Sequence, residues 1–286
     1  MTDNYGREID SIKISVTQRC NLDCPYCHKE GEFNNTGGEI SLTEIGKMIT
    51  AAKEFKFKKI KITGGEPLLR NDIIEIIKII KKIGFEDISL VTNGFFLGQY
   101  AGQLSEAGLD RVNIGCDSPS FNSLPKNTKN ITAGLNAAVA AGLFPVKLNM
   151  VVLKNVNDGE IDSMIEFARR NDAILQLIEL INTDNDYYKK YHCDLEPIEK
   201  NLERKAEKII EKKDNGRKQY DLGDVLIEVV RPTGKSFCKN CRKLRITSDG
   251  KLKPCLMLND TRIEFKDRSS FIEAVNRRVV FNDRHN

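Results

Sequence analysis

The sequence predicts an α/β protein built on a partial (β/α)6 barrel of the TIM type, followed by a small C-terminal auxiliary region. Short apolar segments alternate with amphipathic helical patterns throughout residues 1–181. Several of these segments are continuously apolar, which is typical of parallel strands buried on both faces. The chain then becomes polar before a second cysteine-containing segment. We therefore expect a barrel core at residues 1–181 and a region at residues 182–286 that closes the barrel.

Each predicted element of the core has its own local signal. Strands are predicted at residues 12–17, 59–63, 88–92, 111–115, 146–153 and 174–181. Helices are predicted between them at residues 41–55, 73–83, 97–107, 131–141 and 160–170. Ser41 and Glu44 form a capping-box pattern before the first helix. Asn71 and Asp72 cap the second helix, and Gly84 ends it.

The C-terminal region has weaker signals. Glu and Lys pairs at helical spacing in residues 201–213 predict a solvent-exposed helix. A strand is predicted at residues 224–231, ahead of the cysteine-containing residues 237–257. Catalytic groups of a barrel lie at the carboxyl ends of its strands, so the loops after the strands are the first places to search.

Composition limits the function classes. The chain has 286 residues, with 45 Lys and Arg against 41 Asp and Glu, a formal charge of +4. This charge is too small for bulk nucleic-acid binding but permits a local basic pocket. An apolar run of about 18 residues and a secretion signal are both missing, so we expect a cytoplasmic protein without membrane contact. Because cytoplasmic thiols stay reduced, the 8 cysteines indicate metal binding or catalysis.

The strongest motif is Cys20, Cys24 and Cys27, spaced C-x3-C-x2-C directly after the first predicted strand. Three thiolates on one short loop suit a [4Fe–4S] cluster in which one iron lacks a protein ligand. The alternative is a zinc site with His28 as the fourth ligand.

Cys238, Cys241 and Cys255 form a second set, spaced C-x2-C-x13-C. A zinc ribbon needs a fourth ligand at matching spacing, and none follows within reach. His192 or Cys193 could supply one from a distance. Three thiolates without a nearby fourth indicate a second cluster with an exposed iron.

The first motif resembles that of the radical S-adenosylmethionine (SAM) superfamily, and Gly64-Gly65-Glu66-Pro67 after the second strand is similar to its SAM-contacting segment. From Tyr5 to Met257 the layout resembles the GTP 3′,8-cyclase branch, in particular its archaeal-type members. The resemblance implies two [4Fe–4S] clusters and SAM as cofactors. It also implies a 5′-deoxyadenosyl radical that removes hydrogen from ribose C3′ of GTP. The product, (8S)-3′,8-cyclo-7,8-dihydroguanosine 5′-triphosphate, begins molybdenum cofactor biosynthesis.

The resemblance also implies site residues. The cluster ligands would be Cys20, Cys24, Cys27, Cys238, Cys241 and Cys255. The SAM contacts would be Tyr26, Gly64, Gly65, Glu66, Gly115 and Ile181. The GTP contacts would be Lys13, Lys61, Thr92, Lys147, Lys243, Leu244 and Arg245. No further catalytic residue is implied, because the radical performs the chemistry.

Physical reasoning supports a basic pocket. Side chains in or at the ends of barrel strands can converge on one lumen, although they lie far apart in sequence. Alternation puts Lys59 and Lys61 on one face of their strand. An unpaired charge inside a barrel is costly, so these lysines indicate an anionic ligand. The alternative is that both are surface residues of an edge strand.

Several positions depart from the usual pattern of the branch. Lys13, Lys61 and Lys243 stand where arginine is usual, which keeps the charge and loses the bidentate fork. Gly115 replaces a serine and Ile181 a methionine, so only their backbones would serve SAM. The chain ends without the Gly-Gly tail of many bacterial members. Either the tail contributes nothing here or the substrate differs.

The expected partners are GTP as substrate, a cyclic pyranopterin monophosphate synthase that consumes the product, and a reductant protein of unknown identity. A homodimer is possible. Two alternatives remain: a radical SAM enzyme acting on a peptide or another small molecule, and a non-catalytic zinc-binding adaptor. Lys61, Lys147 and Lys243-Leu244-Arg245 separate the first from a cyclase, since a peptide needs no triphosphate site.

Overall fold

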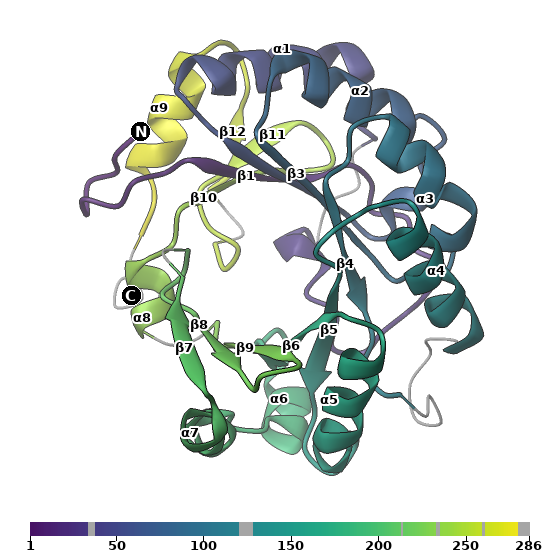
Figure 1. Cartoon of the computed structure of the whole chain (residues 1–286). Coiled ribbons are helices and arrows are strands. Elements are labelled where there is room, and N and C mark those ends of the chain that lie inside the picture. Colours follow the sequence, from purple (N-terminus) through teal and green to yellow (C-terminus); the bar gives the residue numbers. More distant parts are fainter. Residues whose placement is uncertain (34–37, 120–127, 213, 233–234, 259–260, 280–286) are drawn as a thin grey trace.

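The strands form one twelve-stranded sheet that curls around a central space. A computed structural model describes residues 1–33, 38–119, 128–212, 214–232, 235–258 and 261–279. The strand order is β12-β11-β10-β1-β2-β3-β4-β5-β6-β9-β8-β7. Figure 1 looks along the barrel and shows helices α1 to α5 on the outside of the strands.

The predicted parallel β/α core is confirmed. Its strands are β1 (Ser11–Ser15), β2 (Lys59–Thr63), β3 (Asp87–Thr92), β4 (Arg111–Gly115), β5 (Lys147–Val152) and β6 (Ile174–Glu179). Its helices are α1 (Leu42–Glu54), α2 (Ile73–Ile83), α3 (Leu97–Glu106), α4 (Thr128–Ala140) and α5 (Ile161–Arg170). Short 3-10 turns lie at Lys29–Gly31, Pro67–Leu69 and Asp158–Glu160. Each strand from β1 to β6 pairs in parallel with the next.

Local signals account for most helix boundaries. The capping box at α1 is present, because Ser41 and Glu44 exchange side-chain and backbone hydrogen bonds. Gly84 ends α2 in the left-handed conformation at φ 95°. The predicted side-chain cap by Asp72 is wrong. Its carboxylate accepts hydrogen bonds of 2.6 and 3.0 Å from Arg70 instead, because this buried guanidinium requires an anion.

The predicted helix at residues 201–213 is confirmed only as far as Lys205. Helix α7 covers Glu196–Lys205, and the chain then forms strand β7 at Lys208–Glu211. Pro197 favours the earlier start, since proline is tolerated only in the first turn of a helix. Ile209 pairs with Tyr220 of β8 (Lys218–Asp221), so sheet pairing outweighs the local charge pattern.

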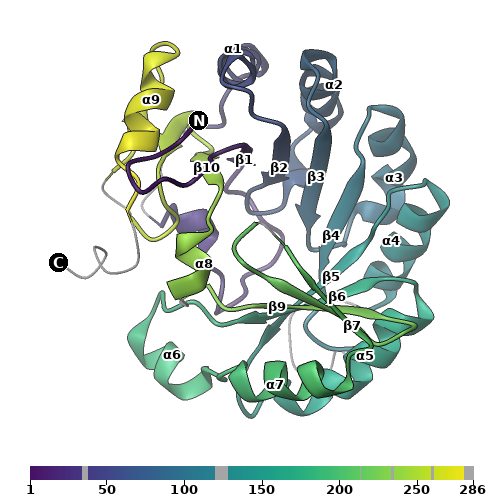
Figure 2. The same ribbon diagram turned by 60° about the vertical axis from the view of Figure 1, so that its left-hand side comes forward.

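The C-terminal half adds strands to both edges of the core sheet. Strand β9 (Leu226–Val230) lies parallel to β6, and β10 (Lys243–Ile246) lies parallel to β1. Strands β11 (Lys251–Lys253) and β12 (Ile263–Glu264) continue beyond β10. Helices α6 (Asn185–Tyr191), α8 (Lys235–Lys239) and α9 (Ser269–Asn276) complete the chain, as Figure 2 shows. Residues more than 200 positions apart thus become neighbours across β1 and β10.

The apolar core lies between the sheet and the outer helices. In α2 the buried residues are Ile73, Ile76, Ile77 and Ile80, one face of the helix. Strand residues Ile60, Ile62, Ile88 and Leu90 belong to the same buried cluster. The other face of the strands carries polar and charged side chains, which point to the centre of the barrel. In the part of the chain that the structure describes, no helix has the length and apolar character to cross a membrane.

Truncating the core on a C-terminal strand tests whether both halves fold as one unit. Ile227 of β9 is fully buried in the main cluster. We expect Ile227→Ala to lower the free energy of unfolding by about 2–5 kcal/mol. Anaerobic urea denaturation measures this change. Ile209→Ala, at a side chain 42% exposed, is the control and should change stability by only about 0.5 kcal/mol. Similar small effects for both variants would contradict a shared core.

Candidate active site

Two cavities open inside the barrel. The larger, of about 750 Å³, lies at the first residues of the strands and is called here the amino-terminal cavity. The second, of about 180 Å³, is lined by Cys238, Cys241 and Cys255 and is called the cysteine-lined cavity. Lys61, Arg217 and Lys243 line both. The two cavities therefore adjoin at basic side chains.

Strand register aligns basic side chains around the barrel interior. Arg245 of β10 pairs with Lys13 of β1, and Lys13 pairs with Lys61 of β2. The row continues through Ser89 of β3 to Arg111 of β4. Register partners in a parallel sheet point to the same face, so these side chains lie next to one another. We call Arg245, Lys13, Lys61 and Arg111 the cation row.

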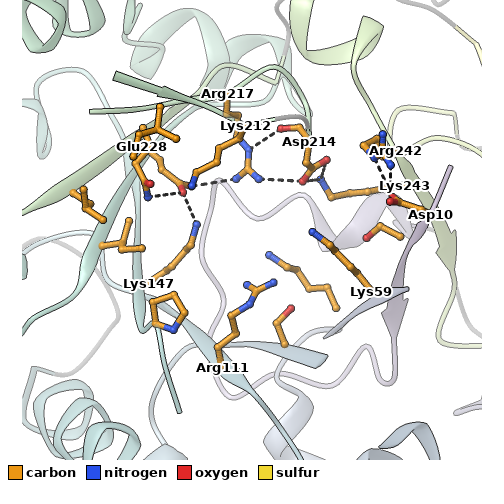
Figure 3. Close-up of a pocket in the computed structure, with 18 of the residues that line it drawn as sticks. Asp10, Lys59, Arg111, Lys147, Lys212, Asp214, Arg217, Glu228, Arg242 and Lys243 are labelled. Carbon is orange, nitrogen blue, oxygen red and sulfur yellow. Dashed lines mark hydrogen bonds and ion pairs between the residues drawn. The ribbon is translucent and has the colours of Figure 1, made fainter. Parts of the chain in front are cut away.

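The amino-terminal cavity is strongly basic, with eight cationic and four acidic side chains in its lining. Figure 3 shows Lys147 and Arg217 near Glu228, and Lys243 near Asp214. The Lys147 Nζ lies 2.6 Å from Glu228, and the Lys243 Nζ lies 2.6 Å from Asp214. Arg217 joins the two carboxylates at 3.0 and 3.3 Å. These ion pairs hold the cations in place and leave excess positive charge.

Lys61 is the exception in this arrangement. Within the described residues its ammonium has no hydrogen-bond or ion-pair partner, although it lines both cavities. Burial lowers its pKa well below the usual range, and the charges of Arg111 and Lys243 lower it further. A half-buried amine between two cavities, without a partner in the described residues, is a site at which an anionic ligand would favour the ammonium form.

The first cysteine motif lies on the loop after β1, at the carboxyl end of the strand. The backbone N–H groups of Leu22 and Lys29 donate to the sulfurs of Cys20 and Cys27 at 3.4 Å. Burial raises the pKa of both thiols. Hydrogen bonds to sulfur are typical of cluster-binding thiolates, whose potential they tune. The loop therefore fits an iron–sulfur cluster.

A single metal ion fits the cysteines less well. Among the described residues, no three His, Cys, Asp or Glu side chains converge as they would around one ion. The cysteines of a [4Fe–4S] cluster bind different irons, so they need not converge. His28 Nδ1 already accepts the Glu30 N–H at 3.1 Å, and burial lowers the His28 pKa to about 4. His192 and Cys193 belong to the segment beside Leu153 and Glu179 and do not line the cysteine-lined cavity.

Gly64 and Gly65 let the chain after β2 approach the first cysteine loop. A side chain at either position would overlap the backbone of Thr17 or Arg19. The Gly65 N–H donates to the Thr17 carbonyl at 2.8 Å. Only glycine permits this close approach. Both residues therefore fix the segment that leads into Cys20, whatever they contact besides.

Glu66 is fully buried, and both carboxylate oxygens accept hydrogen bonds. The Thr92 hydroxyl donates at 2.8 Å and the Asn93 N–H at 2.7 Å. Burial raises the Glu66 pKa. Thr92 is buried, and it lines neither cavity. Glu66 and Thr92 thus join the ends of β2 and β3.

Tyr26 connects the first cysteine loop to the ends of β4 and β5. Its hydroxyl donates to the buried Asp117 carboxylate, and the Val151 N–H donates to the other oxygen at 2.9 Å. Asn157 donates to the Asp117 carbonyl at 2.8 Å. Sequence reasoning missed Asp117, although its position directly after β4 was a usable signal.

The second cysteine set is supported by arginines from both chain ends. Arg7 donates to the Cys238 carbonyl and Arg278 to the Cys241 carbonyl, each at 2.9 Å. Asp3 accepts from both guanidinium groups, at 2.7 and 3.1 Å. Burial opposes ionisation of Cys241, but the charges of Arg278 and Lys243 lower its pKa to about 7. This environment favours the thiolate that a cluster requires.

The structure separates the remaining predicted residues. Lys13, Ile181 and Arg245 line the cysteine-lined cavity, and Lys147 lines the amino-terminal cavity. Leu244 is fully buried in the apolar core, so only its backbone faces a ligand. Gly115 ends β4 and lines neither cavity. Sequence reasoning also missed the carboxylates that pair with the lysines, namely Glu30, Asp214 and Glu228. It missed Arg217, which joins Asp214 and Glu228, as well.

Solved structures resemble this chain in fold. A native anSMEcpe with bound AdoMet superposes with a TM-score of 0.67 at 17% identity, over 96% of this chain and 82% of that one. The Streptococcus suis SuiB bound to S-adenosylmethionine gives a TM-score of 0.65 at 14% identity, over 98% of this chain and 66% of that one. These likenesses concern the fold alone.

Sequence comparisons are closer. Residues 14–168 match the radical SAM superfamily, and residues 173–273 match the Molybdenum Cofactor Synthesis C family. A probable GTP 3′,8-cyclase of Methanothermobacter thermautotrophicus is 43% identical over 98% of both chains. A probable GTP 3′,8-cyclase of Methanosarcina acetivorans is 42% identical over 94% of this chain and 84% of that protein. The chain therefore belongs to the radical SAM superfamily, in the family of these probable GTP 3′,8-cyclases.

Proposed function

We propose that this protein is a GTP 3′,8-cyclase, the enzyme of the first step of molybdenum cofactor biosynthesis. It converts GTP to (8S)-3′,8-cyclo-7,8-dihydroguanosine 5′-triphosphate with SAM and two [4Fe–4S] clusters. The observation that carries the proposal is that Lys13, Lys61 and Arg245 of the cation row line the same cavity as the second cysteine set. The relatives named as probable GTP 3′,8-cyclases support it along nearly the whole chain.

The residues that the resemblance implies would hold the cofactors. Cys20, Cys24 and Cys27 would bind the first cluster, and Tyr26 with the Gly64–Glu66 segment would face SAM. Cys238, Cys241 and Cys255 would bind the second cluster at the wall of the cysteine-lined cavity. When bound, these groups supply the 5′-deoxyadenosyl radical that abstracts ribose C3′ hydrogen and a metal contact for guanine.

The basic side chains would bind the triphosphate. Lys61 offers an unpaired ammonium, and Lys147 and Lys243 exchange part of their pairing with Glu228 and Asp214 for phosphate oxygens. Lysine acts as a point charge, so these contacts attract phosphate without the planar geometry of arginine. Among the predicted GTP contacts, only Arg245 has a guanidinium group that can donate two parallel hydrogen bonds to one phosphate. The lumen also excludes bulk water from a radical reaction.

Two further protein partners are expected for this reaction. We infer that the cyclised triphosphate passes to a cyclic pyranopterin monophosphate synthase, and that a separate protein supplies the electron. A homodimer in the cytoplasm is also proposed. The division at residue 181 is also proposed, with a radical SAM core at residues 1–181 and a region at residues 182–286 that carries the second cluster and closes the barrel. The change of family match between residues 168 and 173 supports a division nearby.

A peptide substrate is less well supported. Eight cationic side chains line the amino-terminal cavity, and a peptide gives no reason for that concentration of charge. A zinc-binding adaptor also lacks support, because His192 and Cys193 lie away from the second cysteine set. A colourless protein with zinc and no iron would restore that alternative.

The direct test is anaerobic incubation with SAM, dithionite and GTP, with product analysis by mass spectrometry. We expect a cyclised triphosphate and 5′-deoxyadenosine from the native protein. Cys24→Ala should abolish both, because SAM cleavage is lost. Cys255→Ala should keep part of the SAM cleavage and lose the cyclised product. If GTP gives no product and a leader peptide is modified instead, the proposal is wrong.

Lys61→Gln tests the phosphate site. Loss of a charged hydrogen bond of about 1.5–3 kcal/mol should weaken GTP binding roughly 10- to 100-fold. SAM affinity should stay within about twofold, since Lys61 lines both cavities and the Gly64–Glu66 segment lines neither. Anaerobic calorimetry measures both, with Lys78→Gln on the exposed face of α2 as the control. Equal losses for GTP and SAM would argue against a specific phosphate contact.

The lowered pKa of Lys61 predicts proton uptake on GTP binding. In the free protein burial favours the neutral amine, whereas a bound phosphate favours the ammonium. The pKa therefore rises on binding, and GTP affinity falls as the pH increases from the Lys61 pKa of the free protein towards that of the complex. Calorimetry at pH 8 in two buffers of different ionisation enthalpy measures the uptake. It should shrink in Lys61→Gln, and an unchanged uptake in that variant would assign the proton elsewhere.

A further inference from the structure

The turn after the first cysteine motif has an unusual backbone. Lys29, Glu30 and Gly31 adopt φ angles of 43°, 52° and 72°, three left-handed residues in succession. Such conformations cost free energy at non-glycine positions and persist only where the surroundings demand them. A side chain at Gly31 would overlap the Leu256 carbonyl and the Lys253 ammonium. The turn is therefore pressed against the second cysteine segment.

This conformation directs the Glu30 carboxylate into the barrel. Glu30 is 7% exposed. Its Oε1 lies 2.6 Å from Lys13 Nζ and accepts from the Thr63 hydroxyl at 3.1 Å. Its Oε2 lies 2.6 Å from Arg245 Nη1. Burial opposes ionisation, yet the charges of Lys13 and Arg245 hold the Glu30 pKa well below its usual range.

The three partners of Glu30 come from three strands that serve different parts of the site. Lys13 is on β1, which leads into the first cysteine loop, and Arg245 is on β10 between the second-set cysteines. Thr63 ends β2, directly before Gly64. Lys13 and Arg245 are register partners of like charge, and without an anion between them they repel. Glu30 supplies that anion from the cysteine loop itself.

We propose that Glu30 is a positioning residue. Its carboxylate holds Lys13 and Arg245 side by side, so that the triphosphate of GTP is presented to the first cysteine loop in one orientation. The inference rests on the proposed function and adds a residue that no resemblance assigned. Glu30 acts through the two cations and does not itself touch the substrate, since an anion facing phosphate is repulsive.

The variant Glu30→Gln keeps the shape and removes the charge. We expect the ratio of 5′-deoxyadenosine to cyclised product to rise at least fivefold at saturating GTP, because substrate is bound in more than one orientation. Glu30→Asp keeps the charge and should restore part of the coupling. A purely structural role would lower the melting temperature and leave the ratio unchanged.

Glu32→Gln is the matched control. Glu32 is buried two residues away in the same loop and accepts from the Ser248 backbone at 3.0 Å and its hydroxyl at 2.8 Å. Its variant should keep the native ratio of 5′-deoxyadenosine to product. If Glu30→Gln also keeps the native ratio while the native protein cyclises GTP, the inference on Glu30 is wrong and the proposed function stands.

Amide hydrogen exchange on the cluster-loaded, substrate-free protein provides a second measurement that does not depend on turnover. We expect Glu30→Gln to raise exchange at least tenfold in residues 28–32 and in residues 243–246 together, because both lose their shared anchor. Exchange unchanged in residues 243–246 would overturn the inference. A native protein that cleaves SAM but never cyclises GTP would instead remove the proposed function, and exchange would still decide the role of Glu30.

Discussion

The interior of this barrel depends on the balance between a row of half-buried basic side chains and the carboxylates that face them. Parallel register places Arg245, Lys13, Lys61 and Arg111 side by side, an arrangement that is repulsive by itself. Three compensating carboxylates come from outside strands β1 to β6, whereas Arg111 pairs with Asp87 of β3 at 2.7 Å. Glu30 lies on the first cysteine loop, Asp214 between β7 and β8, and Glu228 on β9. The barrel therefore depends on its C-terminal region for two of these carboxylates, Asp214 and Glu228.

Pairing between buried carboxylates and basic side chains also positions the two cysteine segments. The first cysteine loop is fixed to the sheet by the ion pair between Glu30 and Lys13. Gly64 and Gly65 fix it further, because they allow the chain after β2 to approach the backbone of Thr17 and Arg19. The second set is tied to the amino terminus through Asp3, which pairs with Arg7 and Arg278. Buried ion pairs add little net stability but are costly to break singly, so they specify arrangement more than they add strength.

The fold alone does not identify the substrate of this chain, because a fold can host many functions, and likenesses to anSMEcpe and SuiB at 17% and 14% identity concern the fold alone. The cavity lining makes the distinction. Lys61 has no partner in the described residues, and Lys147 and Lys243 pair with Glu228 and Asp214, which phosphate oxygens could replace. This lumen therefore suits a compact polyanion. The proposed cyclase activity rests on this electrostatic environment together with the closely related sequences.

The sequence by itself determined the order of strands and helices, the two cysteine motifs and the convergence of lysines on one lumen. These depend on periodicity, spacing and caps, which are properties of near neighbours. It did not determine β7, where pairing with Tyr220 outweighed a helical charge pattern. Nor did it indicate Glu30, Asp117, Asp214 or Glu228 as partners of the site. Only the tertiary structure decided those contacts, because an ion pair depends on where the folded chain brings distant segments together.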